Sequence, residues 1–303
     1  MLIKSLFSFL EKITNKEKYL DKKFLNKINK KIDFYNSNIK NKLLKIDNTL
    51  KDKREISFLH SGHLGDLIYS LAVIKKIAQT HKCKLYIQIN KKNKVEYKNH
   101  PAGNVLINKK MGDFFLPLIK KQNYLDVAEI YNNEPIDIDL DFFREIPVNI
   151  FSHSMRWYSH LTGVPISMDE PFLEVEKKLN FHNKITIVRT TRYRNYYINY
   201  KFLQNAKNII CVGLKSEYEE LKKDIPNLIF HDCKNFLEMA EIINSSKFFI
   251  GNMTFAYAVA EALKIPRLLE VSPDYPVVFP VGKNGYDFYH QIHFEKYFNL
   301  LNN

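Results

Sequence analysis

Residues 60–66, HSGHLGD, could bind an anion through their backbone and move a proton through a side chain. The segment follows an apolar run and precedes a helical pattern, and Gly62 and Gly65 let the chain turn tightly where that helix starts. The free amides and the dipole of a helix N-terminus favour a negatively charged group at such a turn. Asp66, in the first helical turn, is interpreted either as a general base or as an ordinary helix cap.

A second segment, RTTRYR at residues 189–194, places three arginines and two threonines directly after a predicted strand. Guanidinium groups match phosphate oxygens in pairs, so this segment suits a diphosphate. A solvated basic loop would have the same composition. The position at the carboxyl end of a strand, where open α/β sheets bind their ligands, favours the binding interpretation.

The third segment, FIGNMTFAYAVAEA at residues 249–262, joins a strand to a helix of small residues through the polar turn Asn252–Thr254. This turn also presents amides and a hydroxyl group to an anion. The alanines are expected in the core. The turn after the first strand is not a GxGxxG motif and no acidic residue clearly closes the second strand, so a nicotinamide cofactor is not expected.

Strand and helix patterns alternate around these segments, which predicts parallel sheets with crossover helices. The predicted strands are 56–60, 84–89, 126–131, 185–189, 208–213, 228–231, 247–251 and 267–271; the predicted helices are 66–78, 114–122, 151–163, 216–224, 235–244, 255–263 and 295–301. Two doubly wound units in tandem usually bind a ligand between them. Asp137, Asp139 and Asp141 alternate and would share one face of a strand. They are interpreted as cation ligands, as contacts to an acceptor or, most simply, as part of an exposed strand or loop edge.

The N-terminal segment differs from the rest of the chain. Residues 1–55 hold 15 basic and 7 acidic side chains, and apolar residues recur at helical spacing opposite lysines. Two interpretations stay open: a peripheral membrane anchor on anionic lipid, or a helical hairpin packed on its own domain or on a second subunit. The first residues do not form a secretion signal, because charges close a short apolar run that has no cleavage site.

Composition limits the class of protein. The 303 residues are 45% hydrophobic and 26% charged, which excludes a disordered or collagen-like chain. The formal net charge is +13, but most of it lies in residues 1–55, so nucleic-acid binding is not expected. Three widely spaced cysteines exclude a disulfide framework and indicate a reduced, cytoplasmic compartment. No apolar run is long enough to span a bilayer.

In this order, the three segments resemble the motifs of the ADP-heptose:lipopolysaccharide heptosyltransferase family over residues 56–275. The family's Gly-x-x-Gly-Asp turn, with its proposed catalytic aspartate, corresponds to Gly62, Gly65 and Asp66. Its Thr-Thr-Arg turn corresponds to Thr190, Thr191 and Arg192. The resemblance also places Glu217, or Glu219 after a shift, near the donor ribose and base.

The chain departs from the family pattern at its third motif. Residues 252–254 read Asn-Met-Thr where the family has Asp-Thr-Gly, and Tyr257 stands where histidine is common. Together the motifs and the resemblance predict a donor site, whose residues are Gly62, Gly65, Arg189, Thr190, Thr191, Arg192, Arg194, Gly213, Glu217, Gly251, Asn252, Met253, Thr254 and Tyr257. The departures leave the donor sugar and its nucleotide open.

The resemblance implies an α/β fold of the glycosyltransferase B type, in which two Rossmann-like, doubly wound domains face a cleft. We expect a basic amphipathic helical extension at residues 1–55, an N-terminal acceptor domain at 56–175 and a C-terminal donor domain with a final helix at 176–303. Family members need no metal, so neither a metal nor a cofactor other than the nucleotide-sugar substrate is expected.

These observations predict a metal-independent glycosyltransferase that moves a sugar from a nucleotide diphosphate to an acceptor hydroxyl, in cell-surface glycan or lipopolysaccharide synthesis. Asp66 is the expected base, with His63 or His60 as alternatives. The acceptor is a glycan or a lipid-linked molecule, and the enzyme is cytoplasmic or peripheral on the cytoplasmic membrane face. A non-catalytic nucleotide- or glycan-binding module on the same fold is the alternative.

Overall fold

The computed structural model describes residues 12–94, 100–146, 153–275 and 277–303. By its internal contacts the chain divides into two compact units, Met1–Lys51 and Asp52–Asn303. Residues 1–11, which contain most of the apolar residues at the start of the predicted helical extension, lie outside the described ranges.

The described part of the first unit is helical. It contains α2 (Lys16–Phe34), the π-helical turn η1 (Tyr35–Ile39) and most of α3 (Lys40–Asp52). Asn15 caps α2 by accepting a hydrogen bond from the Lys18 amide at 3.1 Å. The apolar side chains Leu20, Phe24, Leu25 and Ile32 are at least half exposed, and lysines surround them in sequence. Within the described ranges, every helix is too short or too polar to cross a bilayer.

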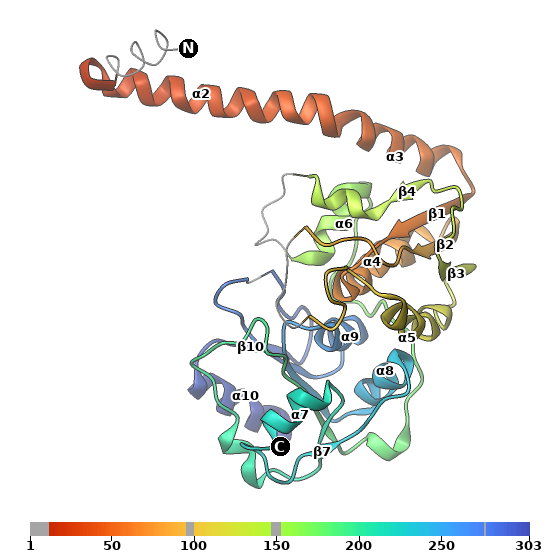
Figure 1. Cartoon of the computed structure of the whole chain (residues 1–303), viewed down its shortest axis with the longest axis vertical. Helices are drawn as coiled ribbons and strands as arrows, with labels where there is room; N and C mark the ends of the chain where they lie inside the picture. The colour runs from red at the N-terminus through yellow and green to blue at the C-terminus, as the bar shows by residue number, and fades with distance from the viewer. Residues whose placement is uncertain (1–11, 95–99, 147–152, 276) are drawn as a thin grey trace. The chain divides into compact units, whose positions relative to one another are not determined.

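The second unit begins with a four-stranded parallel sheet in the order β3-β2-β1-β4 (Figure 1). Its elements are β1 (Glu55–His60), α4 (Leu64–Ile77), β2 (Lys82–Ile87), α5 (Lys109–Lys120), β3 (Val127–Ile130), β4 (Ile138–Asp139), the 3₁₀ helix η2 (Leu140–Arg144) and α6 (Ser154–Thr162). Most of β1 and α4 is buried, as expected when helices cover both faces of a parallel sheet.

A six-stranded parallel sheet follows, in the order β10-β9-β8-β5-β6-β7. Its elements are the 3₁₀ helix η3 (Leu179–Phe181), β5 (Ile185–Val188), the 3₁₀ helix η4 (Lys201–Asn205), β6 (Ile209–Cys211), α7 (Lys215–Leu221), β7 (Ile229–Phe230), α8 (Phe236–Ser245), β8 (Phe248–Asn252), α9 (Phe255–Leu263), β9 (Arg267–Glu270), β10 (Gly285–Phe288) and α10 (Gln291–Asn302).

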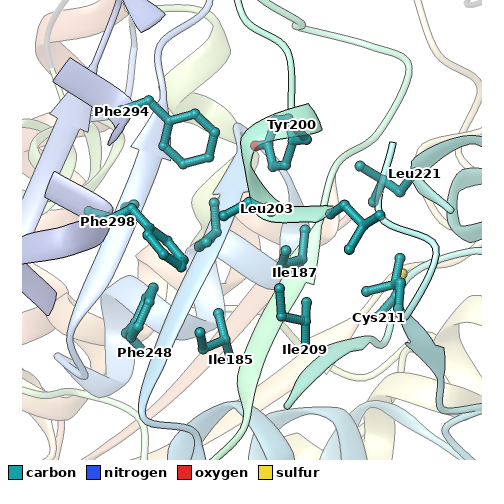
Figure 2. Packing of buried hydrophobic residues seen from close by; sticks show 14 of the residues in the cluster. Ile185, Ile187, Tyr200, Leu203, Ile209, Cys211, Leu221, Phe248, Phe294 and Phe298 are labelled. Carbon is teal, nitrogen blue, oxygen red and sulfur yellow. The ribbon is translucent and has the colours of Figure 1, made fainter. Parts of the chain in front are cut away.

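The core of the second sheet explains why α10 docks there. Figure 2 shows Phe248 of β8 beside Phe298 of α10, and the centroids of their rings lie 5.6 Å apart. The rings of Phe288 and Phe294 stack with their centroids 4.1 Å apart. Burying such aromatic side chains removes a large apolar area from water, so the C-terminal helix is a structural part of this sheet.

Helices of the two sheets pack against each other, α4 on α9 and α5 on α8. Phe115 of α5 lies 6.5 Å from the ring of Phe236 and 5.8 Å from that of Phe255. At Gly65, near the start of α4, an added Cβ would lie 3.8 Å from the Cβ of Ala258 in α9. The two helix starts that carry the predicted motifs are therefore held near one another.

The expectation of an α/β fold with parallel sheets is confirmed. Two strands were not predicted. β4 is only two residues long, and β10 follows a segment with little apolar alternation. Both lie at the edge of a sheet, where one hydrogen-bonding side stays unpaired and the sequence signal is weakest.

Candidate active site

The turn after β1 depends on glycine. Gly62 has a φ of +98°, and a Cβ at this position would lie 2.6 Å from Cγ1 of Ile107. The left-handed backbone and the lack of space both require a residue without a side chain. His63 then forms the N-cap of α4, and Asp66 lies in its first turn, as the sequence predicted.

His60 is fully buried and uses both ring nitrogens to hold this turn. Its Nδ1 accepts a hydrogen bond from the Gly62 amide at 2.9 Å, and its Nε2 lies 2.8 Å from the Tyr158 hydroxyl. Because Nδ1 accepts, the proton lies on Nε2 and is donated to Tyr158. Burial lowers the pKa of His60 to about 3, although Asp141 opposes the shift. His60 is thus a neutral structural residue, and the prediction of His60 as an alternative base does not fit this geometry.

Asp141, in η2 directly after β4, closes the turn. It accepts hydrogen bonds from the hydroxyl and the amide of Ser61, and its carboxylate pairs with Lys91 at 2.8 Å and Arg144 at 2.5 Å. Burial acts to raise the pKa of Asp141, but His60, Arg144, Lys91 and Ser61 outweigh burial and hold it below its ordinary value. A buried, ionised carboxylate of this kind orders everything bonded to it.

The expectation that Asp137, Asp139 and Asp141 share one exposed face is wrong. β4 ends at Asp139, and the 3₁₀ helix that starts at Leu140 turns Asp141 inward, where it is 6% exposed. Asp139 remains exposed and accepts a hydrogen bond from the Asp141 amide at 2.9 Å. The alternation ends because the strand is only two residues long.

Arg144 connects the turn to Asp66. Its guanidinium pairs with the Asp66 carboxylate at 3.2 Å, donates to the Gly62 carbonyl and lies 4.3 Å from the centre of the Phe143 ring. The Asp66 side chain is 23% exposed. Burial raises the pKa of Asp66, and Asp141 adds to the shift while Arg144 opposes it. A carboxylate with a raised pKa is a stronger base, so the site fits proton abstraction.

The arginines of the second turn divide into two kinds. Arg189 is buried, with Nε and Nη2 on the Glu270 carboxylate at 2.7 and 2.9 Å, and its guanidinium lies over the Tyr200 ring. Arg194 bonds the Thr190 carbonyl at 2.7 Å and pairs with Glu220. Both arginines therefore fix the loop. Their predicted role as ligands of a diphosphate does not agree with these contacts.

The charge of Arg192 reaches groups near the first sheet. Arg192 is half-buried, with its guanidinium 5.3 Å from the centre of the Tyr193 ring. Its charge contributes to lowering the pKa values of His63 and His100 near the first sheet, and it also opposes the raised pKa of Glu217. Thr190 is half-buried and Thr191 is exposed beside it.

Asn252 closes the second turn. The fully buried side chain accepts from the Thr190 amide at 3.0 Å and donates to the carbonyls of Thr190 and Arg192 at 3.1 and 2.8 Å. An aspartate could accept but, when ionised, could not donate to either carbonyl. The departure from the family pattern at residue 252 is thus explained by the turn that this side chain supports. Asn252 itself lies too deep to bind a donor, in contrast to the prediction.

The neighbouring motif residues have separate roles. Gly251 leaves no space for a side chain, because a Cβ would lie 2.6 Å from the Val188 carbonyl. Thr254 caps α9 by accepting from the Tyr257 amide at 3.0 Å, and Met253 is half-buried before it. The Tyr257 side chain is fully buried in the core, so its predicted role in donor binding is not supported by this position.

Glu217 and Glu219, the two alternatives for the donor glutamate, lie in different environments. Glu217 is buried and accepts from the Leu214 amide at 3.2 Å, and a Cβ at Gly213 would lie 3.0 Å from its Oε2. Burial raises the pKa of Glu217 to about 7, against the effects of the Leu214 amide, Arg194 and Arg192. Glu219 is exposed and pairs with Lys215 at 3.1 Å.

Sequence reasoning named Asp141 only within an acidic alternation, and it missed Arg144, Lys91 and His100. The aspartate and the arginine lie three residues apart, the spacing that joins side chains on one helical turn, and that was the available signal. Lys91 and His100 belong to loops, and no motif or periodicity around them in the sequence indicates a functional role.

No family model and no curated protein matches the sequence. Among solved structures, E. coli heptosyltransferase WaaC with ADP matches with a TM-score of 0.55 at 10% identity, covering 82% of this chain and 100% of that one. A glycosyl transferase family 9 structure from Veillonella parvula matches with a TM-score of 0.52 at 9% identity, over 82% and 89% of the two chains.

The chain has the heptosyltransferase fold. The resemblance that the three motifs indicated is therefore confirmed at the level of the fold, which is that of a class of glycosyltransferase enzymes.

One expectation about this fold needs correction. The glycosyltransferase TibC from enterotoxigenic E. coli matches with a TM-score of 0.51 at 14% identity, over 78% of this chain and 62% of that one, and it is described as dodecameric and iron-containing. The expectation that proteins of this kind hold no metal is therefore wrong. In the described ranges of this chain, no three His, Cys, Asp or Glu side chains cluster as metal ligands.

Proposed function

We propose that this protein is a glycosyltransferase that moves a sugar from a nucleotide-diphosphate donor to an acceptor hydroxyl. The main observation in support of this proposal is the position of Asp66. Its carboxylate is half-buried at the start of α4, has a raised pKa and pairs with Arg144. The heptosyltransferase fold supports the same conclusion, and two of the neighbours hold ADP or an ADP-heptose analogue.

In this proposal, residues 56–175 and 176–303 are the acceptor and donor domains of a B-type glycosyltransferase. The Asp66 carboxylate takes the proton of the acceptor hydroxyl as its oxygen attacks the anomeric carbon. The bond from that carbon to the diphosphate breaks, and the nucleoside diphosphate leaves with the bonding electrons. Arg192 and the amides at the start of α9 stabilise the charge on the leaving group.

The remaining site residues have supporting roles. Arg144 positions Asp66 without neutralising it fully, and Glu217 accepts hydrogen bonds from the ribose of the donor. His63, at the N-cap of α4, is the alternative base. Burial, Arg144 and Arg192 lower the pKa of His63 to about 4, so it is a neutral imidazole at physiological pH.

A screen of ADP-, UDP-, GDP-, CMP- and dTDP-linked sugars by thermal shift tests donor binding. A ligand at about 100 times its dissociation constant should stabilise the chain by about 2.7 kcal/mol. We expect a shift within one nucleotide family and its loss in Arg192→Ala, with Lys215→Ala as a matched exposed control. No shift with any donor would contradict the proposal.

The alternative is a binding module without transferase activity, which the unusual Asn252 turn keeps open. An enzyme and a binding module differ in whether they turn over the donor. Once the donor is identified, release of nucleoside diphosphate in the presence of a lipid-linked or glycan acceptor supports the glycosyltransferase. Tight donor binding with no release of nucleoside diphosphate in the presence of any of these acceptors favours the non-catalytic binding module.

We further propose that the first unit binds anionic lipid at the cytoplasmic membrane face, which suits a lipid-linked acceptor in cell-surface glycan synthesis. α2 combines exposed apolar side chains with seven lysines and three acidic residues. Both apolar insertion and lysine–headgroup attraction contribute to such binding.

The full chain should float with phosphatidylglycerol vesicles but not with phosphatidylcholine vesicles. Replacing Lys22, Lys23, Lys27 and Lys30 by Glu should abolish flotation, and unchanged flotation would contradict lipid binding.

A further inference from the structure

A row of aromatic rings lies at the β10 edge of the second sheet. We call it the aromatic band; it consists of Tyr197 in the loop after β5, Tyr289 directly after β10, and His290, His293 and Tyr297 at the start of α10 and along it. The centroids of successive rings are 6.0, 5.1, 5.7 and 6.3 Å apart. Tyr197 is 68% exposed and Tyr289 36% exposed, and both histidines are exposed. A continuous exposed surface of this kind is typical of an interaction site.

A buried asparagine fixes the two tyrosines at the start of the band. The side-chain nitrogen of Asn195 donates to the Tyr289 carbonyl at 2.9 Å, and its side-chain oxygen accepts from the Tyr197 amide at 3.0 Å. Asn195 is fully buried, and its own amide donates to the Glu270 carboxylate at 2.7 Å. The backbones of Tyr197 and Tyr289 are therefore held together before any ligand binds. Such pre-organisation lowers the entropy that a binding site loses when it is occupied.

The loop and the helix that carry the band fill the core with other rings. Tyr200 comes from the same loop as Tyr197, but it is fully buried, and its ring lies 4.9 Å from that of Phe294 between centroids (Figure 2). On α10, Phe294 and Phe298 are buried, whereas His293 is exposed. Core packing thus accounts for Tyr200, Phe294 and Phe298 but leaves Tyr197 and His293 in contact with water.

The band carries little charge in a chain that is strongly basic overall. Residues 195–200 contain no Lys, Arg, Asp or Glu, and residues 285–297 contain only Asp287, Glu295 and Lys296. A nucleic acid or an anionic membrane would need basic side chains beside the rings. The face of an aromatic ring is negative and attracts C–H groups, and the tyrosine and histidine tips form hydrogen bonds. A sugar ring offers C–H groups on its face and hydroxyls at its edge, without charge.

We propose that the aromatic band binds an uncharged glycan, with sugar rings stacked on Tyr197 and Tyr289. This assignment rests on the proposed function and deepens it, because it identifies the acceptor as an extended glycan chain. Strands β5, β8, β9 and β10 are parallel, so the residues that follow β5 and β10 lie at one edge of the sheet. The turn that joins Thr190 to Asn252 lies at the same edge. A glycan on the band is therefore bound on the side of the sheet where transfer is proposed.

Isothermal titration of the full chain with linear oligosaccharides of glucose, mannose and N-acetylglucosamine tests this site without a donor. We expect at least one oligosaccharide to bind, and its monosaccharide to bind far more weakly. Tyr197→Ala and Tyr289→Ala should each weaken binding about tenfold, whereas Tyr197→Phe keeps the ring and should stay within about threefold. Leu179→Ala, which removes an exposed apolar side chain of η3, is the matched control. Melting temperatures show whether each variant is folded.

The outcomes separate this assignment from the proposed function. If no oligosaccharide binds, or if both alanine variants bind like the unchanged chain, the assignment is overturned, while nucleotide-sugar binding and turnover still test the enzyme. Glycan binding through Tyr197 in a chain that binds no nucleotide sugar would support the glycan site and contradict the proposed enzyme. Self-association that Tyr197→Ala abolishes, measured by sedimentation, would make the band an interface between two copies and overturn the assignment. Binding of oligo(dT) that Tyr197→Ala abolishes would overturn it in favour of a nucleic acid.

Discussion

The turns after β1 and β5 are built on the same plan but closed by different chemistry. Each follows an inner strand of a parallel sheet, and each is closed by a buried side chain from the adjacent strand or just beyond it. The first turn is closed by the ionised Asp141, with Arg144 and Lys91 around it. The second is closed by the neutral amide of Asn252. The two closing side chains therefore act differently on the charged group that each turn carries, which is Asp66 in the first turn and Arg192 in the second.

In the proposed function the first turn presents Asp66 as a base, and a charged closure suits that role. The Asp141 carboxylate repels the charge on Asp66 and so contributes to raising the pKa of that group. In the same proposal the second turn presents the cation of Arg192, and a neutral closure suits that role. A carboxylate at residue 252 would offset the charge of Arg192, whereas an amide does not. Each closing side chain thus supports the electrostatics of the turn as well as its shape.

Asp66→Asn should have the largest effect and tests whether the first turn delivers a base. Removing a positioned general base lowers the rate by about 10² to 10⁴-fold. Transfer measured as kcat/KM should fall by this factor, while the dissociation constant of the nucleotide sugar stays within about twofold. Asp113→Asn, which is exposed on α5 and pairs with Lys109, is the matched control. Near-normal transfer by Asp66→Asn would remove the basis of the comparison.

Asp141→Asn tests the charged closure. The amide keeps the shape of the carboxylate but leaves Arg144 and Lys91 without their counter-charge. Because both cations retain contact with water, we expect a loss of about 2–3 kcal/mol in the free energy of unfolding, measured in urea. A loss no greater than that of Asp113→Asn would show that the first turn, like the second, needs only a neutral closure.

Glu217→Gln tests the raised pKa of a buried carboxyl group near the second turn. Because the pKa of Glu217 is about 7 in the folded protein and 4.5 ordinarily, the folded state binds the proton more tightly. Stability therefore falls as the pH rises from about 4.5 to about 7, and the full cost remains above that. The variant should be more stable than the unchanged chain at pH 8, by on the order of 2 kcal/mol, and this gain should shrink severalfold at pH 5. An equal difference at the two pH values would contradict the shifted pKa.

Asn252→Asp tests the neutral closure of the second turn. At pH 8 it should lower the free energy of unfolding by at least about 2 kcal/mol, because a buried carboxylate would face the two carbonyl oxygens to which the amide donates. Nucleotide-sugar affinity should fall as well, since Arg192 loses both its fixed carbonyl and part of its positive field. Lowering the pH should restore part of the affinity as the carboxyl group is protonated. Asn227→Asp is the control, an exposed asparagine that donates to the Ala206 carbonyl. If both variants behave alike, the buried amide has no special role.

The fold and the motif positions could be predicted because they depend on local patterns. Apolar strands alternate with helical periodicity, and Gly62 and Gly65 mark a turn that the structure places where expected. The partners of the motif side chains could not be predicted in this way. Arg189 turns inward because Glu270, 81 residues away, offers it a buried carboxylate, and no local feature of either segment shows this.

The same limit applies to Asp141 and Tyr257. The aspartate belongs to an acidic alternation that indicated an exposed strand edge until the early end of β4 turned it inward. The tyrosine stands in a family motif, but its side chain lies within the core under α9. Motif position therefore indicated where the chemistry gathers, and three-dimensional packing decided which side chains take part.

The distance in sequence between each turn and its closing side chain sets the order in which the site can assemble during synthesis. Ser61 is bonded by a residue 80 positions later, and Thr190 by one 62 positions later. A chain that emerges from the ribosome N-terminus first has completed β1 long before Asp141 exists, and β5 long before Asn252 does. Neither turn can reach its final form as its own segment emerges, so a truncated chain that ends before Asn252 should hold a finished first turn and an open second one.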